Sequence, residues 1–329
     1  MEKTAVLLVN LGTPDAPDPK SVRRYLAEFL SDPRVIDLPR WKWLPILHGI
    51  ILRVRPKKSA KLYQSVWTDK GSPLLLNGQK QQAALQDRLS ETGVHVVLAM
   101  SYGRPNLNEE LEKLHDWGVR RIVVLPLYPQ YSSTTVGPIW DSLQRSLAGW
   151  RDLPELMFLR DYPDHPNYIA AMVARVLNYI ATHGMPDRLI LSYHGIPIRY
   201  AQTGDDYPLR CRITTELMKQ KLPELAILET FQSKFGNEEW LTPATIDTVR
   251  NLARQGVNHV AVIAPGFSAD CLETLQELAQ ENAKAFNEAG GQQFGYIAAV
   301  NDHPLFIDCL EDFVRQNLRL PSAIQTSQK

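Results

Sequence analysis

The sequence is poor in cysteine and has no excess charge of either sign. Its three cysteines, Cys211, Cys271 and Cys309, lie far apart among 329 residues. This spacing matches neither a disulfide framework nor the clustered ligands of a zinc or iron–sulfur site, and it favours a reducing compartment, the cytoplasm. Lysine plus arginine and aspartate plus glutamate each total 36, so the overall charge provides no attraction to nucleic acid.

Long apolar runs and nucleotide-binding motifs are missing as well. No segment has the roughly 20 mostly apolar residues that a membrane-spanning helix needs, and the N-terminal region lacks the pattern of a signal peptide. Neither G-x-G-x-x-G nor G-x-x-x-x-G-K occurs, which argues against the usual phosphate-binding loops. We therefore expect a ligand other than a nucleotide.

Two pairs of stretches repeat a pattern in the same order. LLVNLGTP at 7–14 matches LILSYHGIP at 189–197, and WGVRRIVVLPLYPQ at 117–130 matches QGVNHVAVIAPGFS at 255–268. Each stretch contains a short apolar run that Gly or Pro ends, which is typical of a buried parallel strand. The repeat predicts two similar domains, each a parallel sheet flanked by helices.

The remaining elements fit this alternation of strands and helices, which is typical of a Rossmann-like α/β fold with a cleft between two domains. We expect the domains at 1–160 and 161–329, with the last helix packing back on the first domain. Further strands are expected at 4–10, 94–100, 156–160, 188–191, 226–231 and 294–298. Helices are expected at 20–30, 77–90, 106–117, 136–147, 166–182, 209–221, 243–255, 271–289 and 304–318.

The first half is longer than the second, and the extra residues fall at about 32–73. This insertion has an apolar and aromatic run that includes Trp41, Trp43 and Ile50, followed by a cluster of basic residues. Two interpretations stay open. The run packs as an extra helix pair, or it forms an apolar lip beside cations that suits an amphiphilic acid or a membrane surface.

His194 is the first candidate for chemistry. It follows the buried strand of LILSYHGIP, and ligands of open α/β sheets bind at the carboxyl ends of strands. Histidine can accept a proton or ligate a metal near neutral pH, although a structural role is equally compatible with this position.

PGFSADCLETLQEL supplies the second candidate. Asp270, Glu273 and Glu277 are spaced three and four apart, so one face of a helix carries all three carboxylates. Asp270 and Glu273 also fit a capping box, a purely structural role. One imidazole facing several carboxylates suits a transient site for a divalent metal.

Aromatic residues in loops form the third group of candidates. Trp240 lies in a loop bounded by Gly and Pro, and Tyr131 and Phe267 occupy matched loops of the two halves. Such rings either stack on a flat ligand at the mouth of a cleft or form small hydrophobic clusters.

Taken together, LLVNLGTPDAP, PLYPQYS, LSYHGIP, TFQSKFG…EEWL and PGFSADCLETLQE resemble the ferrochelatase family. The resemblance runs from about Thr4 to about Leu318. It implies the chelatase-type fold, and insertion of ferrous iron into protoporphyrin IX as the last step of haem synthesis. It also implies that Fe²⁺ is a substrate and that no cofactor is tightly bound.

The resemblance also implies a role for each matching residue. His194 and Glu273 match the reactive pair that handles protons and metal, with Asp270 and Glu277 as a relay. Porphyrin contacts are implied at Leu11, Trp240 and Phe267. Tyr131 is expected to make a further contact because of its position in the matched loop. Carboxylate contacts at the pocket mouth are implied at Arg55, Lys58 and Tyr63.

Departures from the family pattern refine these expectations. Some members carry an iron–sulfur cluster on a cysteine-rich C-terminal extension, and the isolated cysteines here predict no such cluster. Leu11 replaces a tyrosine common in members that use coproporphyrin, which favours protoporphyrin IX. The alternatives are a chelatase for another tetrapyrrole or metal, or a non-catalytic porphyrin or haem carrier. The expected location is the cytoplasm, with peripheral contact at the inner face of the membrane through the lip.

Overall fold

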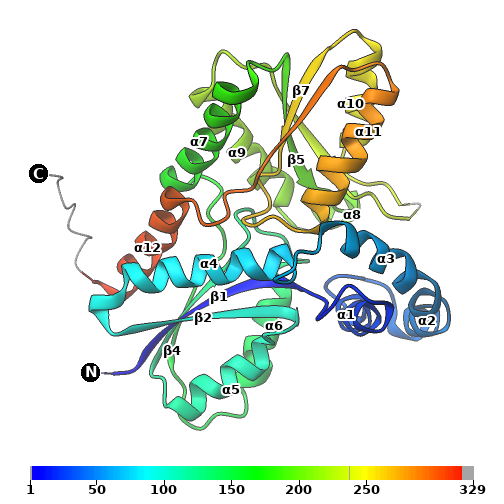
Figure 1. Cartoon of the computed structure of the whole chain (residues 1–329). Helices are drawn as coiled ribbons and strands as arrows, with labels where there is room; N and C mark the ends of the chain where they lie inside the picture. The colour runs from blue at the N-terminus through cyan, green and yellow to red at the C-terminus, as the bar shows by residue number, and fades with distance from the viewer. Residues whose placement is uncertain (1, 237, 321–329) are drawn as a thin grey trace, which may run out of the picture.

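The computed structural model describes residues 2–236 and 238–320, which form two four-stranded parallel sheets (Figure 1). The first sheet has the order β2-β1-β3-β4 and the second the order β6-β5-β7-β8. The strands of the first sheet are β1 (Thr4–Thr13), β2 (Val94–Gly103), β3 (Arg121–Pro126) and β4 (Glu155–Phe158). Those of the second are β5 (Arg188–His194), β6 (Ile227–Gln232), β7 (His259–Ile263) and β8 (Gln293–Ile297).

The matching strand orders confirm the predicted repeat and the fold class. In both sheets the strand of the first repeated stretch lies between its two successors, and every pair is parallel. Residues Ala5 to Val9 of β1 and Leu189 to Leu191 of β5 are fully buried, as expected for strands covered on both faces. The division into domains at about residue 160 stays a prediction.

Helices cover both faces of each sheet, close to the positions expected from the sequence. Around the first sheet lie α1 (Pro19–Ser31), α4 (Pro73–Arg88), η2 (Ser90–Thr92), α5 (Leu107–Trp117) and α6 (Val136–Leu147). Around the second lie α7 (Pro166–His183), α8 (Ile198–Gln202), α9 (Tyr207–Lys221) and α10 (Thr245–Arg254). The chain continues through η3 (Glu273–Asn282) and α11 (Ala283–Glu288) to the final helix, α12 (Pro304–Leu318).

One expected helix has a different form. The segment 271–289 does not form a single α-helix, because η3 is a π-helix with i→i+5 hydrogen bonds and only α11 is α-helical. π-helical segments are rare and frequently lie at functional sites. Asp270 precedes this helix and therefore does not share its exposed face.

The insertion is helical, and its apolar run is partly buried and partly exposed. It forms α2 (Arg40–Ile46), η1 (Leu47–Ile51) and α3 (Leu52–Val66), at the right of Figure 1. Trp43 and Leu47 are buried in a hydrophobic cluster with residues of α1, whereas Trp41 is 75% and Ile50 60% exposed. No helix among the described residues is long and apolar enough to cross a membrane. Membrane contact through the exposed apolar residues stays a prediction.

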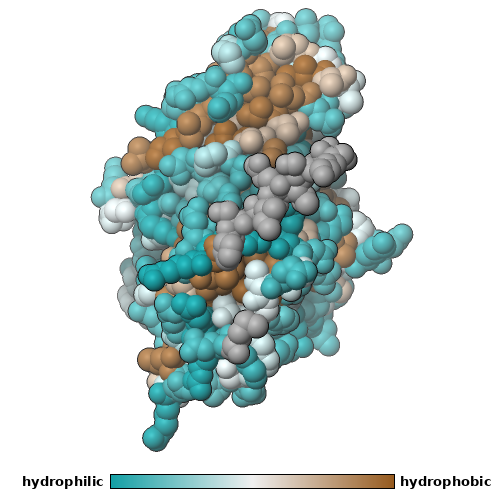
Figure 2. Space-filling model, turned by 90° about the vertical axis from the view of Figure 1, so that its left-hand side faces the viewer, coloured by the Kyte–Doolittle hydropathy of each residue, from teal (hydrophilic) through white to brown (hydrophobic). Residues whose placement is uncertain are grey.

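The two halves share a hydrophobic core. One cluster contains Val6 and Leu8 of β1, Leu189 and Leu191 of β5, and Phe306 of α12. The final helix lies against both α7 and α4, and the Arg88 guanidinium lies 2.9 Å from the Asp308 carboxylate. Figure 2 shows the side of the molecule where α7, α4 and α12 lie, opposite the insertion, with apolar residues gathered in its upper part.

Candidate active site

A cleft of about 770 Å³ lies at the carboxyl ends of the strands of both sheets. The ends of the strands and the loops that follow supply its centre, with Leu11 from β1, Tyr128 after β3, His194 from β5, Gln232 from β6 and Phe267 after β7. Parallel sheets bind ligands at this edge, because the chain leaves each strand there in an irregular loop that can carry functional side chains. The cleft is therefore the principal candidate site.

His194 presents an unprotonated nitrogen when its ring is neutral. Its Nδ1 lies 2.7 Å from the Gly195 carbonyl oxygen. A carbonyl only accepts hydrogen bonds, so Nδ1 carries the proton and Nε2 carries the free lone pair. The imidazole is half-buried at the cleft, with its ring centroid 6.4 Å from that of Phe267. Such a nitrogen can accept a proton from a ligand or bind a metal.

Gly195 allows Trp240 to pack beside His194. A Cβ atom at this position would lie 3.1 Å from the Trp240 ring and 2.9 Å from the Gln232 carbonyl oxygen. Pro197 and Trp240 also form an antiparallel bridge that fixes the loop. The turn that positions His194 therefore positions an aromatic wall as well.

The π-helix η3 contributes three carboxylates to the same cleft. Glu273, Glu277 and Glu281 line it at intervals of four residues. Hydrogen bonding from i to i+5 widens each turn, so residues four apart lie nearly above one another. The result is a row of acids along the cleft wall. The spacing of Glu281 from Glu277 was visible in the sequence, but its role was missed.

Glu273 faces the first half of the molecule. Burial is the main cause of the raised pKa values of Tyr25 and Tyr63, and the charge of Glu273 adds to it. The same charge also acts on Arg55 of α3. Glu273 at the start of η3 therefore lies close to α1 and α3.

Glu277 is held from the other side. Its carboxylate accepts a 2.7 Å hydrogen bond from the Ser233 backbone N–H and a second from the Ser233 hydroxyl. Ser233 adopts a left-handed backbone with φ +65°, uncommon for a residue with a side chain. Burial raises the pKa of Glu277, while the Ser233 hydrogen bonds and the charge of His194 oppose that rise. His194 and Glu277 therefore interact electrostatically.

Apolar side chains form the walls of the cleft. Leu11, Trp240 and Phe267 all line it, as the sequence analysis expected. The Trp240 Nε1 is buried and has no hydrogen-bond partner within residues 2–236 and 238–320. Two aromatic faces and a leucine suit a large flat ligand.

One cation of the insertion reaches the cleft. Arg55 lines it and places its guanidinium 4.9 Å from the centroid of the Phe235 ring, and burial lowers its pKa. Tyr63 also lines the cleft and is nearly buried. Both fit the predicted contacts with a ligand carboxylate.

Three predicted site residues lie elsewhere. Lys58 is exposed and does not line the cleft, although it lies only three residues after Arg55 on α3. Tyr131 is outside the cleft and stacks under Arg160, whose guanidinium carbon lies 3.7 Å from the ring centroid. Asp270 is 7% exposed and does not line the cleft either.

Asp270 is a buried hydrogen-bond acceptor. Its carboxylate accepts from the Tyr296 hydroxyl, the Asn301 side-chain amide, the Ala299 backbone N–H and the Thr274 hydroxyl. The predicted capping partner Glu273 is not involved, since Thr274 takes that place. The environment of Asp270 is that of a structural residue.

The donor set in the cleft is sparse for a permanent metal centre. Within the part of the chain that the structure describes, no three His, Cys, Asp or Glu side chains are arranged to hold a metal ion. Cys211, Cys271 and Cys309 are buried free thiols. The absence of a resident cofactor stays a prediction.

Sequence reasoning missed Gln130, which lines the cleft and links the two halves. This buried side chain donates from Nε2 to the Thr214 hydroxyl at 2.9 Å and to the Tyr168 hydroxyl at 3.3 Å. Its Oε1 has no partner among the described residues. The PLYPQYS motif contains it, but nothing in the motif distinguishes it from the neighbouring aromatics.

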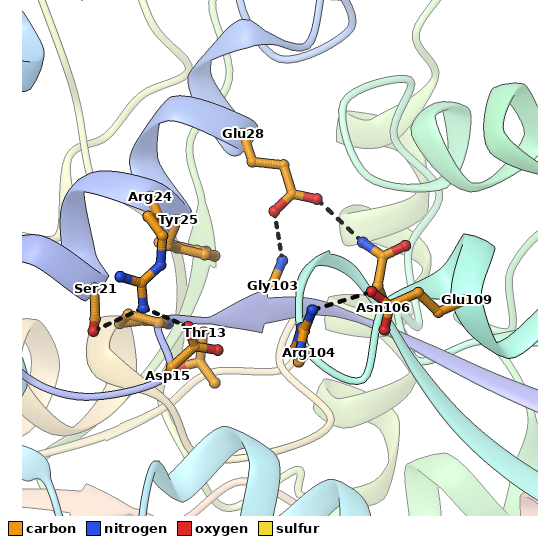
Figure 3. A pocket seen from close by; sticks show the side chains of 11 residues that line it. Thr13, Asp15, Ser21, Arg24, Tyr25, Glu28, Gly103, Arg104, Asn106 and Glu109 are labelled. Carbon is orange, nitrogen blue, oxygen red and sulfur yellow. Dashed lines mark hydrogen bonds and ion pairs between the residues drawn. The ribbon is translucent and has the colours of Figure 1, made fainter.

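A second hollow, of about 490 Å³, lies beside the cleft and shares Thr13 and Tyr25 with it. Figure 3 shows that its charged groups already have polar partners within the hollow. Arg24 contacts Asp15, Arg104 contacts Glu109, and Glu28 accepts from the Gly103 backbone N–H and from the Asn106 amide. This smaller and more polar hollow suits a large flat ligand less well than the cleft does.

Comparison with known proteins agrees with this geometry. The chain matches the ferrochelatase family over residues 3–318. It is 59% identical over 318 residues to a coproporphyrin III ferrochelatase of Symbiobacterium thermophilum, covering 97% of this chain and 99% of that protein. It is 56% identical over 315 residues to a ferrochelatase of Pectobacterium atrosepticum, covering 95% and 98%.

Solved structures support the fold. SirB from Bacillus subtilis with Fe³⁺ aligns with a TM-score of 0.59 at 12% identity, over 95% of each chain. A cobalt complex of the sirohydrochlorin chelatase SirB aligns with a TM-score of 0.54 at 10% identity, over 98% of each chain. Because these identities are low, they show the chelatase fold alone. The family match and the close relatives show that the chain belongs to the ferrochelatase family.

Proposed function

We propose that the protein inserts Fe²⁺ into protoporphyrin IX and releases protohaem. Membership of its family makes it a metal chelatase, a lyase whose reaction is the insertion of a metal ion into a porphyrin. The observation that carries the finer proposal is the placement of the His194 imidazole and the η3 carboxylates in one aromatic cleft. Fe²⁺ is a substrate in this proposal.

The walls of the cleft hold the macrocycle. Leu11, Trp240 and Phe267 all line the cleft, which provides apolar contact for a flat ring. Metal insertion needs the ring bent so that a nitrogen lone pair points out of the plane. A clamp of this kind can use about 1–5 kcal/mol of binding energy to distort the ring.

His194 accepts a pyrrole proton. The reaction exchanges two N–H protons for bonds between the metal ion and the ring nitrogens, so a base must receive each proton. His194 lines the cleft, and its Nε2 keeps a free lone pair because Nδ1 donates to the Gly195 carbonyl. Glu277 on η3 interacts electrostatically with His194 and can stabilise the imidazolium that forms.

The row of carboxylates provides a path for the metal or for the released protons. Glu281, Glu277 and Glu273 follow one another along η3, and carboxylate oxygens are weak enough ligands to pass a divalent ion on. Asp270 does not border the cleft, so we assign the relay role that was expected of Asp270 to Glu281 instead.

A tetracarboxylate substrate is the second candidate. The relative from Symbiobacterium thermophilum is named a coproporphyrin III ferrochelatase. Leu11, at a position where the coproporphyrin-using members commonly have tyrosine, favours protoporphyrin IX. The two porphyrins differ in their number of carboxylates, and both belong in the assay.

The test is anaerobic incubation of the purified protein with Fe²⁺ and either porphyrin, followed by absorbance of the haem product. We expect haem from protoporphyrin IX, and a loss of at least about 100-fold in rate for His194→Ala, since general-base catalysis contributes roughly 10²–10⁴-fold. Porphyrin binding, measured by fluorescence, should persist in this variant.

His95 supplies the matched control, because it is exposed on β2 and does not line the cleft. His95→Ala should retain the full rate. The proposal fails if the unmodified protein forms no haem, or if His194→Ala works as well as His95→Ala.

A further inference from the structure

Arg199 lines the cleft from α8, and two carboxylates already hold its guanidinium. One terminal nitrogen lies 2.6 Å from the Asp37 carboxylate, and Nε lies 3.0 Å from the Glu238 carboxylate. Asp37 comes from the insertion in the first half, and Glu238 from the segment between β6 and α10. All three residues line the cleft. We call them the Arg199 cluster.

The remaining donors of Arg199 also face neighbouring groups. Its second terminal nitrogen lies 3.4 Å from the Asp37 carbonyl oxygen and 3.4 Å from the Tyr200 hydroxyl. The guanidinium carbon lies 4.5 Å from the centroid of the Tyr200 ring. Arginine binds a carboxylate best with two parallel N–H donors, and here those donors are occupied.

The other two cations that line the cleft have no carboxylate partner among the described residues. Arg55 and Lys234 form no ion pair within residues 2–236 and 238–320. The cleft therefore offers two free cations to a ligand, although three cationic side chains line it. This number equals the number of carboxylates on protoporphyrin IX, whereas coproporphyrin III carries four.

The carboxylates that line the cleft also favour a porphyrin with fewer carboxylates. Five of them line it, namely Asp37, Glu238, Glu273, Glu277 and Glu281. They outnumber the three cations, so each ligand carboxylate without a cationic partner meets a negative surrounding. Like charges brought together in an interface cost binding energy and serve to reject the wrong ligand.

We propose that Asp37 and Glu238 occupy Arg199 and thereby prevent it from binding a further substrate carboxylate, which makes the Arg199 cluster a determinant of porphyrin selectivity. This inference rests on the proposed function, since it takes the ligand to be a porphyrin. It concerns the number of carboxylates that the cleft accepts, and it assigns no part in metal insertion to the three residues.

The cluster makes two opposite predictions. The double variant Asp37→Asn with Glu238→Gln leaves Arg199 free, so coproporphyrin III should gain about three- to tenfold in affinity relative to protoporphyrin IX. Arg199→Ala leaves the two carboxylates unpaired, so the ratio of the affinity for coproporphyrin III to that for protoporphyrin IX should fall. If the cluster had only a structural role, both variants would weaken the binding of the two porphyrins to the same extent.

The experiment measures dissociation constants of the two metal-free porphyrins by fluorescence titration of the whole protein. Asp141→Asn is the matched control. Asp141 holds Arg34 at 2.8 Å in a similar ion pair, and neither residue lines the cleft. This control should leave the ratio of affinities unchanged. Glu238→Gln alone gives a milder variant with the same expected direction.

Three outcomes overturn the inference. The inference fails if the unmodified protein binds coproporphyrin III more tightly than protoporphyrin IX. It also fails if the double variant changes the ratio of the two affinities by less than twofold, or if both variants shift this ratio in the same direction. If the protein binds porphyrin but forms no haem, the proposed function fails, whereas the measured selectivity still tests the inference. If the unmodified protein binds no porphyrin, both fail together.

Discussion

At the scale of single residues, Glu277 connects burial with protonation. Burial raises its pKa above the ordinary glutamate value of 4.5, against the effect of the Ser233 hydrogen bonds and the charge of His194. The folded protein therefore binds this proton more tightly than the unfolded chain does. Its contribution to the free energy of unfolding is complete below the unfolded pKa and is lost as the pH rises through the folded pKa.

Glu277→Gln removes this titration and keeps the shape of the side chain. We expect the variant to gain stability relative to the unmodified protein as the pH is raised from below 4.5 towards neutrality. Urea unfolding at several pH values, with a chelator present, measures the difference. Glu112→Gln, at an exposed position of α5, should show no such trend. A constant difference at all pH values would contradict the prediction.

For residues at strand ends the sequence offers a physical reason to expect them at the site, and for residues on helices it offers a weaker one. His194, Leu11 and Phe267 reach the cleft, because a residue at or just after the carboxyl end of a parallel strand lies at the edge of the sheet whatever its neighbours are. Whether Lys58 or Arg55 reaches the cleft depends on the rotation of α3 about its axis. That rotation follows from packing against α1, which local spacing does not contain.

At the scale of elements, the π-helix η3 depends on the buried residue before it. Asp270 accepts hydrogen bonds from Thr274 in the first turn of η3, and from Tyr296, Ala299 and Asn301 on the segment that begins with β8. It thus ties the start of the acidic helix to the edge of the second sheet. The position of the η3 carboxylates follows from this anchor.

Asp270→Ala should lower the free energy of unfolding by about 3 kcal/mol or more, because a hydrogen bond to a charged group is worth roughly 1.5–3 kcal/mol and several are lost. Chemical denaturation measures this loss. Asp302→Ala, at an exposed position close by, should change stability by less than about 0.5 kcal/mol. A stable Asp270→Ala protein that lacks metal insertion would instead support the relay role that the family resemblance implies.

The strand order was accessible from the sequence, whereas the helix type was not. The two repeated stretches predict matching sheets because each half must bury the same apolar strands. The π-helix has no comparable signature, since Glu273, Glu277 and Glu281 fit α-helical spacing equally well. Only the backbone hydrogen bonds, which the tertiary structure selects, distinguish the two forms.

At the scale of the whole molecule, one core spans both sheets. Phe306 of α12 is fully buried and belongs to the cluster that includes residues of β1 and β5. Its ring lies 6.2 Å from that of Tyr162 and 6.4 Å from that of Tyr168. Since α12 also contacts α4 of the first half, the two halves should unfold together.

Phe306→Ala tests this cooperativity. We expect a loss of about 3–5 kcal/mol, the usual cost of removing a buried phenylalanine side chain. Native-state hydrogen exchange reports the loss separately for the slowest amides of β1 and of β5, and both strands should lose the same amount because they share one transition. Leu177→Ala, at a position of α7 that is 51% exposed, should leave both strands almost unchanged. Reduced protection in β5 alone would mean that the halves unfold independently, and the cleft between them would then owe its shape to the ligand rather than to a common core.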